Sequence, residues 1–279
     1  QVAVVAVGGS FSNPLGLIYN IKGDDTLTTE IAKNSAGSQI TTNQDSIVRS
    51  YNDKIYVFGR DSNSAVLVLD NSGENKDPIA NYSLAEIDPD GDIDIDGGSN
   101  GPNPYEIAFE SESVAYVCFY NSNSILKINP LTGKRLAAID VSFMKTIPGA
   151  TSSDADAPNI VDVELINGKL YILAQRLNSF FEPLESVIAI YNTSTSAFVD
   201  TNLDTNEIDG IILSGKNPSE MIYLPTSGKL YVAQGGALTY ASDFSSIEST
   251  ELGSTGIEEV IVSSNTSNGI IIPGTTFGG

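Results

Sequence analysis

A run of alternating aspartates is the part of the sequence best suited to chemistry. Carboxylates stand at every second position between residues 88 and 96, and glycines and an asparagine follow them. The candidate metal ligands are Asp88, Asp90, Asp92, Asp94, Asp96 and Asn100. Carboxylates held this close repel one another, and a bound cation offsets the repulsion. The spacing therefore predicts a site for a hard cation with oxygen ligands, and we expect Ca²⁺ there in a structural role.

The segment from Asp92 to Gly97 matches the first half of an EF-hand calcium loop. Such loops place oxygen ligands at positions one, three and five and a glycine at position six, where the chain turns sharply. The match then ends, because position twelve is Asn103 in place of a bidentate glutamate and no flanking helix is predicted. Glu106 could complete the ligand shell. The alternative interpretation is a solvated acidic loop without a metal ion.

Charge and histidine content narrow the classes of function. The chain has 35 acidic against 14 basic residues and a net charge of −21. This balance argues against binding to nucleic acid or to an anionic membrane surface, which both need clustered Lys and Arg. There is no histidine, so a Ser-His-Asp triad or an imidazole metal site is excluded. Carboxylate-based glycoside hydrolysis and metal-assisted lactone hydrolysis remain, but no spacing points to a catalytic residue.

Several features predict an exported protein. Cys118 is the single cysteine and lies in an apolar run, so we expect a buried thiol and no internal disulfide. No apolar stretch is long enough to span a bilayer. The chain starts at Gln1, which suggests a processed form. Three Asn-x-Ser/Thr triplets agree with a secreted or cell-surface location, and they start at Asn81, Asn192 and Asn265.

The elements that position these residues come from a repeat. Four tyrosines, each at the centre of an apolar strand, are spaced 60, 55 and 60 residues apart: Tyr56, Tyr116, Tyr171 and Tyr231. A polar turn precedes each strand, and a second turn and strand follow it. Each unit is thus a four-stranded antiparallel meander, too small to bury its own faces, and a ring of such units would bury them. The sequence predicts an all-β fold, a β-propeller, with the tyrosines in its core.

We expect one propeller domain over residues 1–279. It is divided into a partial blade at 1–32, blades at about 40–85, 104–145, 158–203 and 217–252, and closing strands at 256–274. Pairing of the N- and C-terminal strands would seal the ring and leave no open sheet edge. This arrangement gives five blades, and six is the alternative because the C-terminal segment has one strand more than closure needs.

Long loops at residues 86–103, 144–159 and 203–217 occupy the same point of the repeat. They should therefore cluster on one face, where propellers usually carry their binding surfaces. Asp154 and Asp156 lie in the second of these loops, and they are either a weaker cation site or hydrated surface carboxylates.

Phe180 and Phe181 stand next to each other in a turn. Adjacent residues of an extended chain point in opposite directions, so both rings cannot point inward. We expect one ring to be exposed as a contact for a partner, and the alternative is that it folds back onto the blade.

The Lys-Leu-Tyr-Val strand at residues 229–232 and the Asn-Pro-Leu-Thr-Gly-Lys turn at residues 129–134 carry a family resemblance. They resemble the YVTN-type β-propeller repeats of bacterial and archaeal surface proteins. The resemblance implies an exported propeller and covers most of the chain. The repeats here are longer than those of that family, so its blade number does not carry over.

Together these features favour a non-catalytic extracellular module for binding or assembly, stabilised by Ca²⁺. A surface-layer, adhesive or filament-associated propeller would suit the acidic composition. Its partner would be a protein or glycan at the cell surface, or further copies of the chain paired through the surplus terminal strand. The alternative function is a metal-dependent hydrolase of lactones or glycans, with its carboxylates in the propeller channel.

Overall fold

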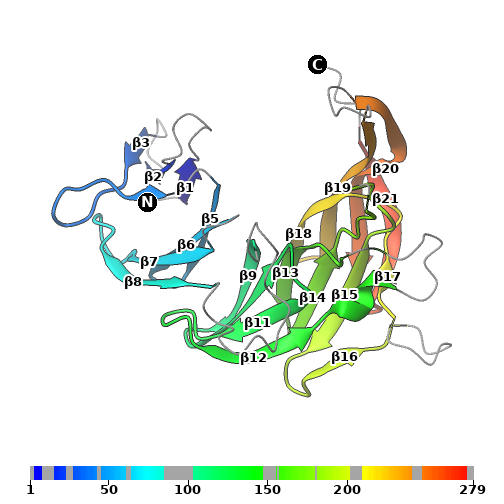
Figure 1. Ribbon diagram of the computed structural model, residues 1–279, viewed down its shortest axis with the longest axis horizontal. Coiled ribbons are helices and arrows are strands. Elements are labelled where there is room, and N and C mark those ends of the chain that lie inside the picture. The colour runs from blue at the N-terminus through cyan, green and yellow to red at the C-terminus, as the bar shows by residue number, and fades with distance from the viewer. Residues whose placement is uncertain are drawn as a thin grey trace. The chain divides into compact units, whose positions relative to one another are not determined.

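The computed structural model describes residues 3–7, 16–22, 28–42, 45–60, 64–84, 103–146, 155, 157–179, 181–201, 209–240 and 247–274. The described residues form five antiparallel sheets (Figure 1). One short 3-10 turn, Ser142–Lys145, accompanies them. In the described part of the chain, no helix has the length and apolar character needed to cross a membrane. The all-β prediction is confirmed.

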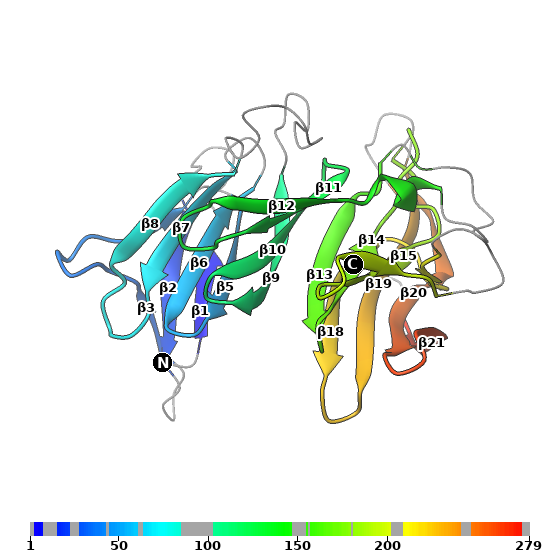
Figure 2. The same ribbon diagram turned by 90° about the horizontal axis from the view of Figure 1, so that it is seen from below.

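The first two sheets come early in the sequence. The first contains β1 (Ala3–Val7), β2 (Gly16–Lys22), β3 (Thr28–Ile31) and β4 (Thr41–Thr42), in the order β1-β2-β3 with β4 also paired to β2. The second is a meander of β5 (Ser46–Tyr51), β6 (Lys54–Gly59), β7 (Ala65–Asp70) and β8 (Pro78–Ser83). These strands lie side by side in Figure 2.

Three further sheets follow. The third contains β9 (Pro104–Ser111), β10 (Val114–Phe119), β11 (Ser124–Ile128) and β12 (Arg135–Asp140). The fourth contains β13 (Ile160–Ile166), β14 (Lys169–Ala174), β15 (Val187–Asn192), β16 (Ala197–Val199) and β17 (Ile211–Ile212). The last contains β18 (Pro218–Leu224), β19 (Lys229–Tyr240), β20 (Ile247–Ile261) and β21 (Thr266–Pro273).

The chain divides into two compact units, which we describe separately. Unit 1 comprises residues 1–105, 109–117 and 126–138, and unit 2 comprises residues 106–108, 118–125 and 139–279. The first and second sheets belong to unit 1, and the fourth and last sheets belong to unit 2. The third sheet contributes strands to both units.

Local sequence explains the hairpins. Asn167 and Gly168 join β13 to β14 with φ angles of 51° and 76°, the left-handed conformations that a two-residue hairpin turn requires. Asn52 occupies the same place between β5 and β6 with φ 50°. Pro104 and Pro218 stand at the first position of their strands, where a missing N–H costs least. Turn chemistry thus sets where each meander begins.

Each unit has a core of its own. In unit 1, apolar side chains of the first and second sheets form one cluster of buried residues: Ile18, Ala32, Ile40, Ile55, Val57 and Leu69. The ring of Tyr51 stacks on Phe109 at 4.7 Å between ring centroids. In unit 2, β13 packs beside β18, and the Asp162 carboxylate accepts the backbone N–H of Met221 from that neighbouring strand. Burial between adjacent sheets therefore holds each unit together.

The expected closing strands at residues 256–274 belong to the last sheet, in which β20 pairs with β19 and β21 pairs with β20. Pairing of the N- and C-terminal strands with each other stays a prediction. Residues 237–240, expected as a separate strand, continue β19, because a bulge at Gly236 with φ 79° carries the strand past the two glycines. Pairing between strands that follow one another closes a shorter loop than pairing between the chain's ends, and so costs less entropy.

Candidate functional site

The predicted metal site lies outside the described residues. This applies to all six expected ligands, Asp88, Asp90, Asp92, Asp94, Asp96 and Asn100, and to Asp154 and Asp156. Within the described ranges, no group of three or more Asp, Glu, Cys or His side chains could hold a metal ion. The Ca²⁺ site therefore stays a prediction.

Two buried carboxylates in unit 2 make mainly backbone contacts. Glu106 and Asp162 each occupy the third position of the first strand of their sheet and are 7% and 4% exposed. Glu106 Oε1 accepts the N–H of Ile107 at 2.8 Å, and Asp162 Oδ1 accepts the N–H of Val163 at 2.7 Å. The second oxygen of Asp162 accepts the N–H of Met221 on β18. These bonds fix the strands and indicate a structural role.

Burial changes the pKa of Asp162. Loss of water around the carboxyl group, together with the nearby charge of Glu106, raises the pKa of Asp162 to about 8, although its backbone N–H donors act in the opposite direction. The folded state therefore favours the protonated form of this side chain more than water does. Sequence reasoning considered Glu106 only as a calcium ligand and missed Asp162. The available signal was an acid at the third position of the apolar strand Ile160–Ile166, which also contains Glu164.

A third buried carboxylate, Glu258, organises the last sheet. It is fully buried and accepts four hydrogen bonds. The donors are the backbone N–H groups of Ser214 and Gly215 at 2.9 Å, Gln234 Nε2 at 3.1 Å, and the Ser267 hydroxyl. All of its donors belong to unit 2. Glu258 thus ties the segment before β18 to the covered face of the last sheet.

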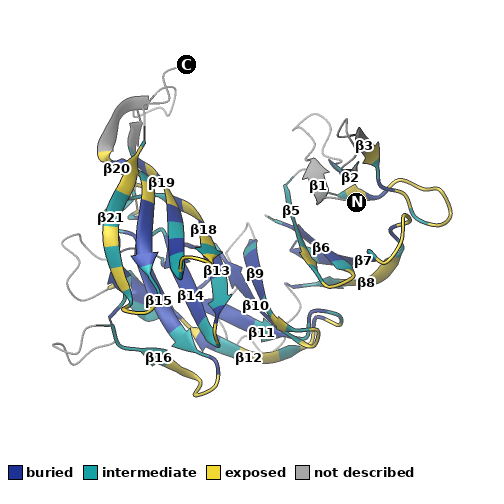
Figure 3. Cartoon of the chain, turned by 180° about the vertical axis from the view of Figure 1, so that it is seen from behind, coloured by how far each residue is buried: buried dark blue, intermediate teal, exposed yellow. Residues whose placement is uncertain are grey.

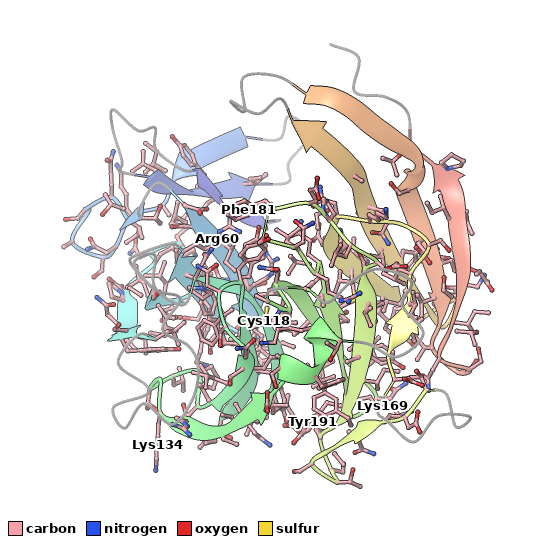
Figure 4. All side chains as sticks on the ribbon, turned by 45° about the vertical axis from the view of Figure 1, so that its right-hand side comes forward. Arg60, Cys118, Lys134, Lys169, Phe181 and Tyr191 are labelled. Carbon is pink, nitrogen blue, oxygen red and sulfur yellow. The ribbon has the colours of Figure 1, made fainter. Side chains whose placement is uncertain are left out.

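The expectations for Cys118 and for three of the four repeated tyrosines are confirmed. Cys118 is fully buried on β10, and this burial raises the pKa of its thiol well above the usual value (Figure 4). Tyr56, Tyr116 and Tyr171 are fully buried as core residues. Tyr231, the fourth copy, is only half-buried.

Phe181 is exposed, as expected for one of the two adjacent phenylalanines. Its side chain is 74% exposed, and its backbone has φ 61°. Figure 4 labels the ring in unit 2, and its N–H donates to the carbonyl of Asn178 at 2.9 Å within the turn. Phe180 lies outside the described residues. A single exposed ring is a small contact and does not by itself define a binding site.

The last sheet has two faces of different character. Strand register places Met221, Val232 and Glu258 in one row, and all three are buried. The next row, on the other face, begins with Ile222 opposite Tyr231. We call this second face the open face. Its apolar members are Ile222, Leu224, Tyr231, Ala233, Ile257 and Ile272.

The open face exposes large aliphatic side chains. Ile222 and Ile272 are each 54% exposed, Leu224 is 44% exposed and Ile257 is 36% exposed (Figure 3). Cross-strand pairing connects several of these positions, because Ile257 lies opposite both Ala233 and Ile272. The apolar side chains therefore extend over four strands, with the charged residues Glu220, Lys229 and Glu259 among them. Exposed apolar surface of this kind marks interaction sites.

The central strands of three other sheets are covered on both faces. The central strands β6, β10 and β14 are buried at every position after the first. On β19, by contrast, buried and uncovered residues alternate from Leu230 to Gln234. Strands with both faces covered read as continuous apolar runs, whereas strands with one free face alternate. The last sheet thus carries an interior type of surface that is uncovered.

The open face carries the charged side chains Glu220, Lys229 and Glu259, and the last two pair with each other. Lys229 Nζ lies 2.9 Å from Glu259 Oε2, and Asn268 Nδ2 donates to Glu259 Oε1 at 2.6 Å. The hydrogen bond from Lys229 lowers the pKa of Glu259. A central apolar patch beside paired polar groups is typical of protein interfaces.

Comparisons with known proteins agree with the repeated meanders. No family model matches the sequence, and no curated protein matches it. Among solved structures, a chain of a nidogen/laminin complex matches with TM-score 0.50 and 10% identity, over 93% of this chain and 74% of that chain. Sqt1 from Saccharomyces cerevisiae matches with TM-score 0.49 and 10% identity, over 88% and 63%. BamB from Moraxella catarrhalis matches with TM-score 0.45 and 9% identity, over 94% and 63%.

Several matched chains are longer than this one, which spans 34%, 45% and 63% of the length of three of them. Identities this low show the fold alone. The chain is an all-β protein with the four-stranded antiparallel sheets of a β-propeller scaffold.

Proposed function

We propose that this chain is an assembly module that binds a second copy of itself through the open face of its last sheet. One observation carries the proposal: aliphatic side chains on that face are about half exposed and β19 alternates between buried and uncovered residues, whereas the central strands of three other sheets are buried on both faces. Burying a large aliphatic side chain from full exposure contributes about 1.5–3 kcal/mol. Covering four half-exposed side chains is therefore a substantial driving force for association.

A second copy is the favoured occupant because its chemistry fits. The open face carries apolar side chains, as do the faces that adjacent sheets bury against each other. The first sheet offers such a surface, since Leu17, Tyr19 and Ile21 on β2 alternate with the buried Ile18 and Asn20 and are themselves only half-buried. Contact between two different faces of identical chains is head-to-tail, and it produces rings or filaments.

The location and the metal remain part of the proposal. The net charge of −21, the Asn-x-Ser/Thr triplets and the resemblance to YVTN-type repeats support an exported surface or filament protein. The alternating aspartates support a stabilising Ca²⁺ ion at residues 88–100. Thermal unfolding with Ca²⁺ and with a chelator tests the metal: a bound ion raises the midpoint, and an unchanged midpoint removes this claim.

The hydrolase alternative receives less support. Both oxygens of the buried Asp162 and one oxygen of the buried Glu106 accept backbone N–H groups. A general acid or nucleophile needs an oxygen directed at substrate.

Sedimentation of matched lysine variants tests the assembly. Ile222→Lys places a charge on the open face, and Ile79→Lys places one at the 50% exposed Ile79 of β8, outside that face. We expect the wild type and Ile79→Lys to form larger species as concentration rises, and Ile222→Lys to stay monomeric with an unchanged unfolding midpoint. A wild type that is monomeric at every concentration overturns the proposal, and so do equal effects of the two substitutions.

A further inference from the structure

A polar cavity in unit 1 is separate from the open face. It has a volume of about 530 Å³ and is open to solvent, since all of its polar lining residues except Asn20 are exposed. Side chains from β2, β3, the segment after β3 and the loop after β7 line it. Six of them are polar: Asn20, Glu30, Lys33, Gln39, Glu74 and Asn75.

The walls of the cavity are fixed by hydrogen bonds. Lys33 and Gln39 form an antiparallel bridge at one side. The loop after β7 docks on this segment, because the Lys76 N–H donates to the Lys33 carbonyl at 2.8 Å. Ser35 donates to Asp77 Oδ1 from both its N–H and its hydroxyl, each at 2.8 Å. The two walls are thus joined before any ligand arrives.

Asn20 provides the observation that points to a ligand. It is only 8% exposed, and its Oδ1 is buried without a hydrogen-bond partner. Buried polar atoms nearly always have a partner, because an unpaired one is costly. Asn20 lies directly opposite Glu30 in the β2–β3 pairing, so the two side chains share one side of the sheet. The cavity therefore presents an unsatisfied acceptor next to a carboxylate.

The side chains that line the cavity favour a ligand that donates hydrogen bonds. Two carboxylates accept hydrogen bonds only, three amides accept and donate, and Lys33 is the one cation among the lining residues. An anionic ligand would meet both Glu30 and Glu74. A bare metal ion fits less well, because the cavity is far larger than an ion and one lining residue is a lysine. A small organic cation fits the volume, the charge and the excess of acceptors.

We propose that this cavity binds a small organic ammonium compound, with the ammonium group on the carboxylates of Glu30 and Glu74 and a further donor on Asn20 Oδ1. Charge-assisted hydrogen bonds from an ammonium to carboxylates are shorter and stronger than neutral ones. The further donor gives Asn20 the partner that it lacks within the protein. The binding is independent of the open face, since none of the lining residues belongs to the last sheet.

Calorimetric titration with matched probes tests the site. Glucosamine and 1,5-diaminopentane are the ammonium probes, glucose and 1,5-pentanediol are their neutral counterparts, and CaCl₂ is the metal control. We expect at least one ammonium probe to bind at millimolar concentration or below and its neutral counterpart to bind roughly tenfold more weakly. Failure of both ammonium probes, or equal binding of the neutral pair, overturns the proposal. Binding of Ca²⁺ alone assigns the site to a metal and also overturns it.

Variants connect the binding to the cavity. Glu74→Gln should weaken the ammonium probe at least roughly tenfold, and Asp53→Asn, an exposed carboxylate of unit 1 outside the lining, should leave it unchanged. Asn20→Leu removes the unpaired acceptor, so it should abolish binding without lowering the unfolding midpoint. Retained binding in Asn20→Leu and Glu74→Gln contradicts the assignment, whatever the outcome of the sedimentation experiment.

Discussion

Strands β14 and β19 carry nearly the same sequence in different surroundings. Both begin with Lys-Leu-Tyr, and both pair with a strand on each side within unit 2. Yet Tyr171 is fully buried while Tyr231 is half-buried, and Leu173 is buried where Ala233 is exposed. Local sequence therefore sets the strand, and the neighbour that covers the second face sets the burial. The same Lys-Leu-Tyr motif can thus be covered on both faces in one sheet and on one face in another.

Removing the two tyrosines tests this difference most strongly. Tyr171→Ala leaves a cavity in a covered sheet, and we expect a loss of about 3–5 kcal/mol in the free energy of unfolding. Tyr231→Ala removes a half-buried ring, so we expect a loss of about 1–2 kcal/mol. Urea unfolding of the two variants measures both values. Equal losses would show that the open face is covered in solution and would contradict the comparison.

Substitutions at two glycines of β20 test how much the close contact between β20 and the edge strand β21 contributes to stability. Gly256 has φ 139°, and an added Cβ would lie 2.2 Å from the Ile272 carbonyl of β21. We expect Gly256→Ala to lose about 1–3 kcal/mol, because both the backbone conformation and this contact are strained. Gly253→Ala is the control, since an added Cβ there meets nothing within 4 Å. A loss of the same size in Gly253→Ala would mean that the effect is one of strand propensity alone.

The meander repeat could be predicted because its signals are local. The tyrosine-centred strands, the Asn167-Gly168 turn and the buried Cys118 all follow from residue type and spacing. The pairing of β20 could not be predicted, because it depends on whether the chain turns at Gly236 or bulges and continues there. Sequence alone does not distinguish a glycine turn from a glycine bulge.

The open face and the cavity of unit 1 could not be predicted from the sequence, and the reasons differ. Strand β18 has apolar residues on both faces, with Met221 on one and Ile222 on the other, as the covered sheets do. Which of the two faces is free depends on whether another sheet packs against it. The local sequence of β18 does not indicate this. The cavity joins Asn20 to Glu74, 54 positions further along the chain, through a loop whose docking is a tertiary event. The acidic loop, which the sequence singled out, lies outside the described residues.

Asp162 allows a pH test of the contact between β13 and β18. Its pKa is about 8 in the folded protein and near 3.8 when unfolded, so the folded state holds its proton more tightly. This contribution to stability is complete below about pH 4 and is lost as pH rises through about 8. We expect the free energy of unfolding to fall over this window, by less than burial alone predicts, since backbone N–H groups stabilise the ionised form.

The Asp162→Asn variant should lose this pH dependence, and urea unfolding between pH 5 and pH 8.5 measures it. Asp140→Asn is the matched control, because Asp140 is exposed and only caps the N–H of Ser142. Its slope with pH should equal that of the wild type. A wild-type slope in Asp162→Asn would show that another group carries the effect and that Asp162 is ionised in the fold.

The smallest effect on stability is expected at Phe181. A variant at this position tests whether one exposed ring or the open face of the last sheet mediates association. Phe181→Gly removes the most exposed aromatic side chain of the described residues, and glycine adopts φ 61° without strain. We expect the free energy of unfolding to stay within about 1 kcal/mol of the wild type, because relief of backbone strain and the flexibility of glycine oppose each other. Sedimentation should show unchanged association. If Phe181→Gly abolishes association while Ile222→Lys does not, the interface lies at the turn, and the uncovered face of the last sheet has another role.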